Sequence, residues 1–237
     1  HMKQAEFVTL YYPHAYAAQK RTGISATAIL AQAALESGWG KAAPGNMFFG
    51  IKDTDGVNGN EQLLVTTEYS RRADLKFPEI ISITPQLRNG QKWFKYKVKD
   101  YFRKYDTAEE CFVDHCNFFY KNKRYAKALQ VKANATAFIK AIAEAGYATD
   151  PKYPEKLIGL IERFELAQYD QEVLGGKVKP KPVIVKDQPA VVETEKLPAQ
   201  LKTPKSIKFT QAWVWEYKNN FVPESEPGNK GEMVMYY

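Results

Sequence analysis

The sequence has no long apolar run and few cysteines, and each of these absences excludes a class of protein. No apolar run approaches the roughly 20 residues that span a bilayer, so we expect no transmembrane segment. The only two cysteines, Cys111 and Cys116, lie five residues apart in one predicted helix. Neighbours on a helix face are three or four residues apart, so a disulfide between them would require a broken helix. We expect two buried, reduced thiols.

The sequence also lacks the patterns that hold metals, nucleotides or nucleic acid. Cys111 and His115 share a helix face, but two ligands are too few for a structural zinc site. No phosphate-binding glycine loop and no Ser-His-Asp arrangement is identifiable, so we expect no metal and no cofactor. The net charge of +7 would suit a polyanion, but Lys and Arg are scattered along the chain. We therefore expect no nucleic-acid partner, and the sequence indicates no oligomeric state.

The residues that are present predict a helical body with one β-rich excursion. The chain has 237 residues, of which 44% are hydrophobic and 26% charged, as in ordinary globular proteins. Helical periodicity covers residues 3–21, where Pro13 predicts a kink or boundary, and resumes after Ser25, a typical N-cap. Residues 53–105 are β-rich, and "RNGQ" predicts a hairpin turn. Helical patterns then return, so the predicted fold class is α+β.

The composition changes after residue 170 and predicts three regions. Residues 1–170 form the main domain, 171–204 a Pro- and Lys-rich linker or strap, and 205–237 a small C-terminal β-element. In the last region one predicted strand face carries Ile207, Phe209, Trp213, Trp215 and Tyr217. Exposed apolar faces of this kind usually mark interaction surfaces, so we expect this element to pack on the main domain.

Glu36 stands at the end of the most apolar predicted helix, "ATAILAQAALE". Acidic residues are disfavoured in the last turn of a helix and are rarely buried. Burial and the negative end of the helix dipole both raise the pKa of a carboxyl, so Glu36 is expected to stay protonated near neutral pH. This is the state of a general acid that protonates a leaving oxygen. Gly38 allows a left-handed exit from the helix, and Trp39 is expected to wall the pocket.

Four stretches of the sequence resemble one enzyme family. They are "AQAALESGWGK…NMFFGIK" (31–52), "TTEYS" (66–70), "NKRYAKAL" (122–129) and "AGYATDPKYPEKL" (145–157). Over about residues 5–165 the chain resembles the glucosaminidase domains of glycoside hydrolase family 73. The resemblance implies a lysozyme-like helical body with a β-lobe across a glycan groove, which cleaves peptidoglycan glycan strands next to N-acetylglucosamine. It also implies export to the periplasm, the cell envelope or the extracellular space, with a signal peptide that is not part of this sequence.

The resemblance assigns roles to several residues. Glu36 matches the catalytic acid, and Glu68 occupies the β-lobe position of a second acid that activates water or stabilises positive charge at the sugar ring. Tyr147 is implied to lie near the sugar whose bond breaks, with its ring on the sugar and its hydroxyl at the 2-acetamido group. Asp150 and Tyr153 follow as predicted substrate-binding residues. The alternatives are a solvated strand glutamate for Glu68 and core packing for the tyrosines.

One motif departs from the family pattern, and three function classes remain open. Family members commonly show Asn-Leu-Phe-Gly where this chain has Met47 to Gly50, so Asn46 and Phe49 are the predicted substrate contacts there. We expect an endo-type N-acetylglucosaminidase whose partner is peptidoglycan. The alternatives are a muramidase or lytic transglycosylase on the same fold, and a non-catalytic glycan-binding or assembly protein.

Overall fold

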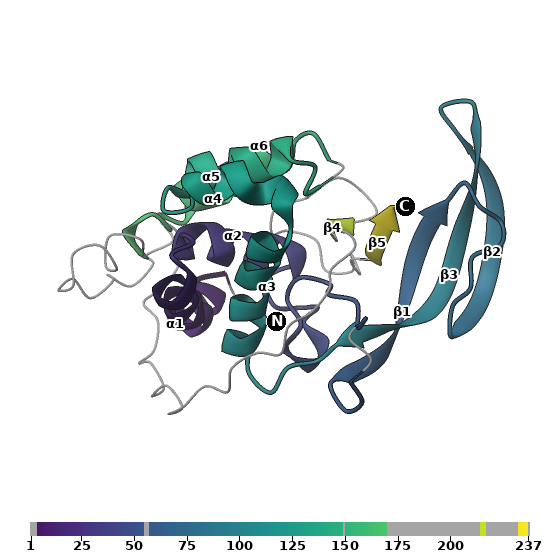
Figure 1. Cartoon of the computed structure of the whole chain (residues 1–237), viewed down its shortest axis with the longest axis horizontal. Helices are drawn as coiled ribbons and strands as arrows, with labels where there is room; N and C mark the ends of the chain where they lie inside the picture. The colour runs from purple at the N-terminus through teal and green to yellow at the C-terminus, as the bar shows by residue number, and fades with distance from the viewer. Residues whose placement is uncertain (1–3, 55–56, 149, 170–213, 217–231, 237) are drawn as a thin grey trace.

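The fold consists of a helical body and a β-sheet that extends away from it (Figure 1). The computed structural model describes residues 4–54, 57–148, 150–169, 214–216 and 232–236. This arrangement confirms the predicted α+β class. The helical segments are α1 (Gln4–Thr22), α2 (Ala26–Glu36), η1 (Pro44–Asn46), α3 (Ala108–Lys121), η2 (Lys123–Tyr125), α4 (Ala126–Gln130), α5 (Ala135–Glu144) and α6 (Tyr153–Arg163).

Helix α2 is the centre of the helical body. All of its 11 residues are buried, and it contacts α1, α5 and α6. Its many alanines let these neighbours approach closely, which buries the helix on every side. The predicted N-cap is confirmed, because the Ser25 Oγ accepts a hydrogen bond of 3.2 Å from the backbone N–H of Ala28. In the described part of the chain, no helix is both long and apolar enough to cross a membrane.

Two sequence predictions concern helices α1 and α3. Pro13 was predicted to mark a kink or a boundary, and helix α1 continues through it, which excludes the boundary and leaves the kink a prediction. Buried residues lie on both sides of the proline, Phe7 before it and Ala18 after it, and this packing outweighs the hydrogen bond that proline cannot donate. In α3 the prediction is confirmed, because Cys111 and Cys116 lie in one helix as free, buried thiols.

The β-rich excursion forms three antiparallel strands, β1 (Glu61–Ser70), β2 (Glu79–Arg88) and β3 (Gln91–Arg103), with β3 between β1 and β2. The turn between β2 and β3 is the predicted one. Asn89 and Gly90 have φ values of 50° and 72°, the left-handed conformations that a tight hairpin turn requires.

Strand β2 forms one edge of the sheet. Its pairing with β3 is shifted by an irregularity between Ile80 and Ser82, and Pro85 lies in its second half opposite Phe94. Apolar side chains along β2 are exposed, including Ile83 at 42% and Leu87 at 77%. Among the described residues, β3 is the strand that pairs with β2, and these side chains of β2 are open to solvent.

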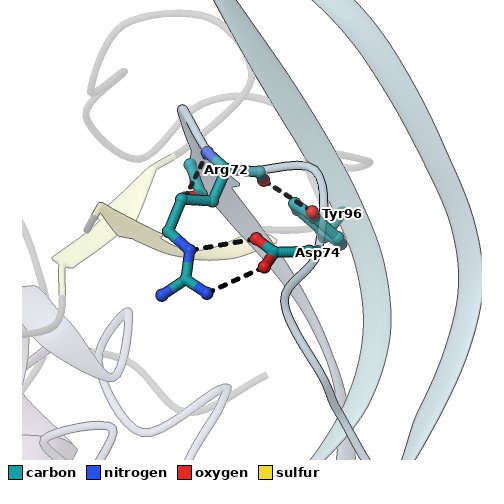
Figure 2. Close-up of polar contacts among 4 residues, drawn as sticks. Arg72, Asp74 and Tyr96 are labelled. Carbon is teal, nitrogen blue, oxygen red and sulfur yellow. Dashed lines mark hydrogen bonds and ion pairs between the residues drawn. The ribbon is translucent and has the colours of Figure 1, made fainter.

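The loop after β1 is fixed to β3. The Tyr96 hydroxyl on β3 donates a 2.6 Å hydrogen bond to the carbonyl oxygen of Arg72. The Arg72 guanidinium binds the carboxylate of Asp74 through two hydrogen bonds of 3.0 Å, as Figure 2 shows. These contacts hold the chain where β1 ends, and Glu68 lies near that end of the strand.

The described part of the C-terminal region extends the same sheet. Strand β5 (Glu232–Tyr236) pairs in parallel with β1, and β4 (Val214–Glu216) pairs antiparallel with β5. The strand order is β2-β3-β1-β5-β4, and β4 also contacts α2 (Figure 1). The linker at 171–204 and the side chains of the predicted apolar face lie outside the described residues. The boundaries of the three regions stay predictions.

Candidate active site

The end of helix α2 places Glu36 inside the protein. The backbone N–H of Trp39 donates to the carbonyl of Ala34 at 2.7 Å, and that of Gly38 donates to Leu35 at 3.3 Å. Gly38 has a φ of 57°, so the chain leaves the helix through the left-handed turn that the sequence predicted. This closed helix end leaves the Glu36 side chain with only 1% of its surface exposed.

Two tyrosine hydroxyls bind the same oxygen of Glu36. The hydroxyl of Tyr147 donates to Oε1 at 2.9 Å and that of Tyr153 at 2.7 Å. Burial raises the pKa of Glu36 from 4.5 to about 8, although the hydrogen bonds from Tyr153 and Tyr147 lower it in part. The carboxyl is therefore protonated at neutral pH.

The hydrogen-bond pattern also determines which oxygen carries the proton. Oε1 already accepts two hydrogen bonds, which occupy both of its lone pairs. Oε2 is buried and has no hydrogen-bond partner among the described residues. The proton of Glu36 therefore belongs on Oε2, where it can be donated to a molecule that enters the site.

Two further buried residues continue this network away from Glu36. The Gln32 side chain, one turn earlier on α2, donates through Nε2 to the Tyr153 hydroxyl at 2.9 Å. Its Oε1 lies 3.1 Å from Nε2 of His115 on α3. Burial lowers the pKa of His115 to about 3, so its ring is neutral. The five polar groups form one continuous buried network.

The second predicted acid, Glu68, lies on β1 and is fully buried. The Lys52 ammonium group contacts its Oε1 at 2.8 Å and the carboxylate of Asp100 on β3 at 2.6 Å. A cation at this distance favours the ionised form of a carboxylate. Across the sheet Glu68 is opposite Tyr96 of β3 on one side and Met235 of β5 on the other. Glu68 is thus a strand residue held by a cation, and not the solvated glutamate of the alternative interpretation.

Tyr147 and Tyr153 both contact Glu36. Both rings are buried and lie 5.5 Å apart, centroid to centroid. Their hydroxyls bind the catalytic-acid candidate, and the predicted contact of Tyr147 with a sugar stays a prediction. The tyrosines therefore act on Glu36, and the core-packing alternative for Tyr153 describes its ring but not its hydroxyl.

Trp39 and Phe49 have the surroundings of core residues. The Trp39 indole is 8% exposed and packs on Phe7 and Phe164, with ring centroids 5.6 Å and 4.7 Å away. The Phe49 ring is 2% exposed and stacks on His115 at 3.7 Å. The predicted contacts of both rings with substrate stay predictions. Phe49 holds the His115 ring in place.

Asn46 and Asp150 are held by the backbone of loops. The Asn46 amide donates to the carbonyl oxygens of Tyr105 and Asp106 at 3.0 and 3.3 Å. The Asp150 carboxylate accepts from the backbone N–H of Lys152 at 2.8 Å and from the Lys156 ammonium at 2.7 Å. Both side chains stabilise turns, and their predicted contacts with substrate stay predictions.

The sequence analysis missed Gln32, His115, Lys52 and Asp100. Gln32 precedes Glu36 by four residues, so the rule that such residues share a helix face was a usable signal. The other three are brought in by tertiary packing, for which the sequence carried no signal. Among the described residues, no three His, Cys, Asp or Glu side chains are grouped to hold a metal ion.

Comparisons with known proteins agree with this site. The family model described as mannosyl-glycoprotein endo-beta-N-acetylglucosaminidase matches residues 12–166. Peptidoglycan hydrolase FlgJ of Pseudomonas aeruginosa is 32% identical over 170 residues, which are 69% of this chain and 37% of that protein. Exo-glucosaminidase LytG of Bacillus subtilis is 27% identical over 241 residues, 99% of this chain and 76% of that protein.

A solved structure of a peptidoglycan hydrolase domain is also similar to this chain. The C-terminally truncated glycoside hydrolase domain of Salmonella typhimurium FlgJ aligns with a TM-score of 0.50 and 30% identity, over 69% of this chain and 98% of that one. The chain spans less than half the length of the Pseudomonas FlgJ that it matches. The family match runs from the middle of α1 to just beyond α6 and includes the Glu36 network and strands β1 to β3. The chain therefore belongs to the glucosaminidase family, which confirms the resemblance to glycoside hydrolase family 73.

Proposed function

We propose that this protein hydrolyses the glycan strands of peptidoglycan as an endo-type N-acetylglucosaminidase, with Glu36 as the general acid. The observation that carries the proposal is a buried carboxyl with a pKa of about 8, whose proton lies on an oxygen with no partner among the described residues. A glycosidase acid must be protonated at working pH and must present that proton to the leaving oxygen. The family match and the names of the relatives support the same activity.

In the proposed reaction, Oε2 of Glu36 gives its proton to the glycosidic oxygen as the bond to the anomeric carbon breaks. A water molecule adds its oxygen to that carbon, and its proton leaves to a carboxylate. Glu68, which contacts the ammonium group of Lys52, is the second carboxylate of the proposal and activates this water or stabilises the positive charge on the sugar. The two tyrosine hydroxyls stay on Oε1 and keep Oε2 free to donate.

Product analysis tests the activity directly. Purified peptidoglycan is digested with the protein, and the new ends are identified by mass spectrometry after borohydride reduction. We expect N-acetylglucosamine at the new reducing ends. N-acetylmuramic acid there would identify a muramidase, and an anhydro sugar a transglycosylase. Internal fragments of many lengths would show endo cleavage, whereas release of terminal units alone would show exo cleavage.

Substitution of the acid tests the mechanism. Glu36→Gln should fold and lose about 10²- to 10⁴-fold in rate, because the amide cannot donate the required proton. Glu144→Gln, an exposed glutamate at the end of α5, is the matched control and should keep full activity. A folded Glu36→Gln protein that digests peptidoglycan at near the wild-type rate would overturn the proposal. A wild-type protein that binds peptidoglycan but does not digest it would favour the glycan-binding alternative.

We also propose that the protein acts in the periplasm or cell envelope, because peptidoglycan lies outside the cytoplasmic membrane. The full-length protein should be recovered from the envelope or periplasmic fraction of its host. Recovery from the cytoplasmic fraction alone would contradict this part of the proposal.

A further inference from the structure

The hydrogen bonds behind Tyr153 have a direction. The Tyr153 hydroxyl can donate only one proton, and this proton lies on Glu36 Oε1 at 2.7 Å. Its oxygen must then accept from Gln32, which donates through Nε2 at 2.9 Å. The other end of the Gln32 amide is its carbonyl oxygen, Oε1, which faces His115. Because a carbonyl only accepts, the His115 Nε2 must carry the hydrogen and donate it.

We propose that His115 and Gln32 are positioning residues that fix the direction of the Tyr153 hydroxyl, so that its proton stays on Glu36 Oε1. The inference rests on the proposed function, since it gives these residues a purpose only if Glu36 is the acid. The N–H of His115 holds the amide of Gln32 in one of its two orientations. In that orientation Tyr153 has a donor behind it and its own proton is available only for Glu36.

Without the His115 N–H, the Gln32 amide has a second orientation. Turned by half a rotation, its carbonyl oxygen faces Tyr153 and competes with Glu36 for the hydroxyl proton. The turned Gln32 amide can take the tyrosine proton only while Glu36 is protonated, because an ionised carboxylate is a stronger hydrogen-bond acceptor and keeps that proton. It therefore stabilises the protonated form alone and raises the pKa of Glu36.

The surroundings of the network are rigid and carry few other charges. The His115 ring stacks on Phe49 with an angle of 6° between the planes and meets the edges of Phe119 and Tyr147. Among the described residues, the titratable groups that interact with Glu36 are Tyr147 and Tyr153 and, from α3, Cys111. Burial and, less strongly, the charge of Glu36 raise the pKa of the Cys111 thiol. These groups stay neutral at the pH where Glu36 titrates, so a changed pKa of Glu36 reports the changed hydrogen bonds.

A double-mutant cycle read by carbon-13 NMR tests the inference. The carboxyl signal of Glu36 is assigned by its loss in Glu36→Gln and titrated with pH. His115→Phe keeps the aromatic stack but removes the N–H, and we expect the pKa of Glu36 to rise by roughly 0.5 unit. When Gln32→Met is also present, no carbonyl remains to compete, and His115→Phe should then change the pKa little. His115→Gln, which keeps a donor, should give a smaller rise.

A purely structural role of His115 would move the pKa equally with and without Gln32→Met, and this result would overturn the inference. The wild-type protein provides a second measurement that does not depend on whether any variant folds. Nitrogen-15 NMR of the His115 ring should find the hydrogen on Nε2 and a bare Nδ1; the opposite tautomer would also overturn it. Neither readout needs catalysis. If the proposed function is wrong, Glu36→Gln will still digest peptidoglycan. If this inference is wrong, His115→Phe will change the pKa of Glu36 equally with and without Gln32→Met.

Discussion

Replacement of Glu36 by glutamine should change how the stability of the protein depends on pH. As the pH rises, the unfolding free energy of Glu36→Gln should increase relative to that of the wild type. The pKa of Glu36 is about 8 in the folded state and near its ordinary value of 4.5 when unfolded. Between these values the folded state binds more protons, so the unfolding free energy of the wild type falls as the pH rises. The stabilisation is complete below the unfolded pKa and is lost as the pH passes the folded pKa. Glutamine does not titrate and shows no such loss.

The magnitude follows from the interval between the two pKa values. About 1.36 kcal/mol per unit over that interval amounts to on the order of 5 kcal/mol, a large part of the total stability of a typical domain. The absolute stability of Glu36→Gln also includes a constant offset, because its amide nitrogen replaces Oε2, which has no partner among the described residues. Only the change of the difference with pH measures the titration.

Urea unfolding followed by tryptophan fluorescence, at intervals between about pH 5 and pH 9, gives the required curves. The difference between Glu36→Gln and wild type should grow by several kcal/mol across this range. The curve of Glu144→Gln should run parallel to that of the wild type. A difference for Glu36→Gln that stays constant within about 1 kcal/mol would refute the raised pKa, and with it the claim that Glu36 is protonated at neutral pH.

Three further substitutions or truncations test the remaining contacts. Tyr147→Phe removes one hydrogen bond that lowers the pKa of Glu36, so the rate should fall less than in Glu36→Gln and the alkaline limb of the pH–rate profile should move to higher pH; an unchanged profile would reduce Tyr147 to packing. Lys52→Met removes the cation that Glu68 and Asp100 share, and the free energy of unfolding in urea should fall by about 3 kcal/mol. The exposed control Lys140→Met should change it little. A fall below about 1 kcal/mol would show that Lys52 does not stabilise this pair of carboxylates. Truncation after Tyr169 removes β5 from the edge of β1, so the melting temperature should fall and binding of a hydrophobic dye should rise. An unchanged melting temperature with loss of glycan affinity would make the C-terminal region a binding module.

Local signals in the sequence predicted the parts of the fold that depend on neighbouring residues. The Asn89-Gly90 turn and the Ser25 cap each rest on conformations or hydrogen bonds within a few residues. Of the two outcomes predicted at Pro13, the boundary was wrong because packing along α1, which no local rule contains, outweighs one missing hydrogen bond. The sequence thus predicted element types well and this helix boundary poorly.

In the candidate site, too, local features were predicted from the sequence and contacts between distant residues were not. The burial and raised pKa of Glu36 followed from its place at the end of an apolar helix. The partners of that carboxyl did not, because Gln32 and His115 are 83 residues apart and meet only when α2 packs near α3. Trp39 was predicted to wall the pocket beside Glu36, and this stays a prediction. Its actual neighbours, Phe7 and Phe164, come from opposite ends of the domain and lay beyond any local pattern.

The edge strand β2 has a consequence for the solubility of the protein. An edge strand with exposed isoleucines is a template on which a second chain can add by backbone hydrogen bonding. Pro85 has no N–H to offer, and the irregularity between Ile80 and Ser82 interrupts the regular spacing of the donors that remain. Both features lie within the ten residues of β2 and leave no long uninterrupted stretch for an incoming strand. We expect these two features to protect the open edge of the β-lobe, with its exposed apolar side chains, against pairing with a second chain.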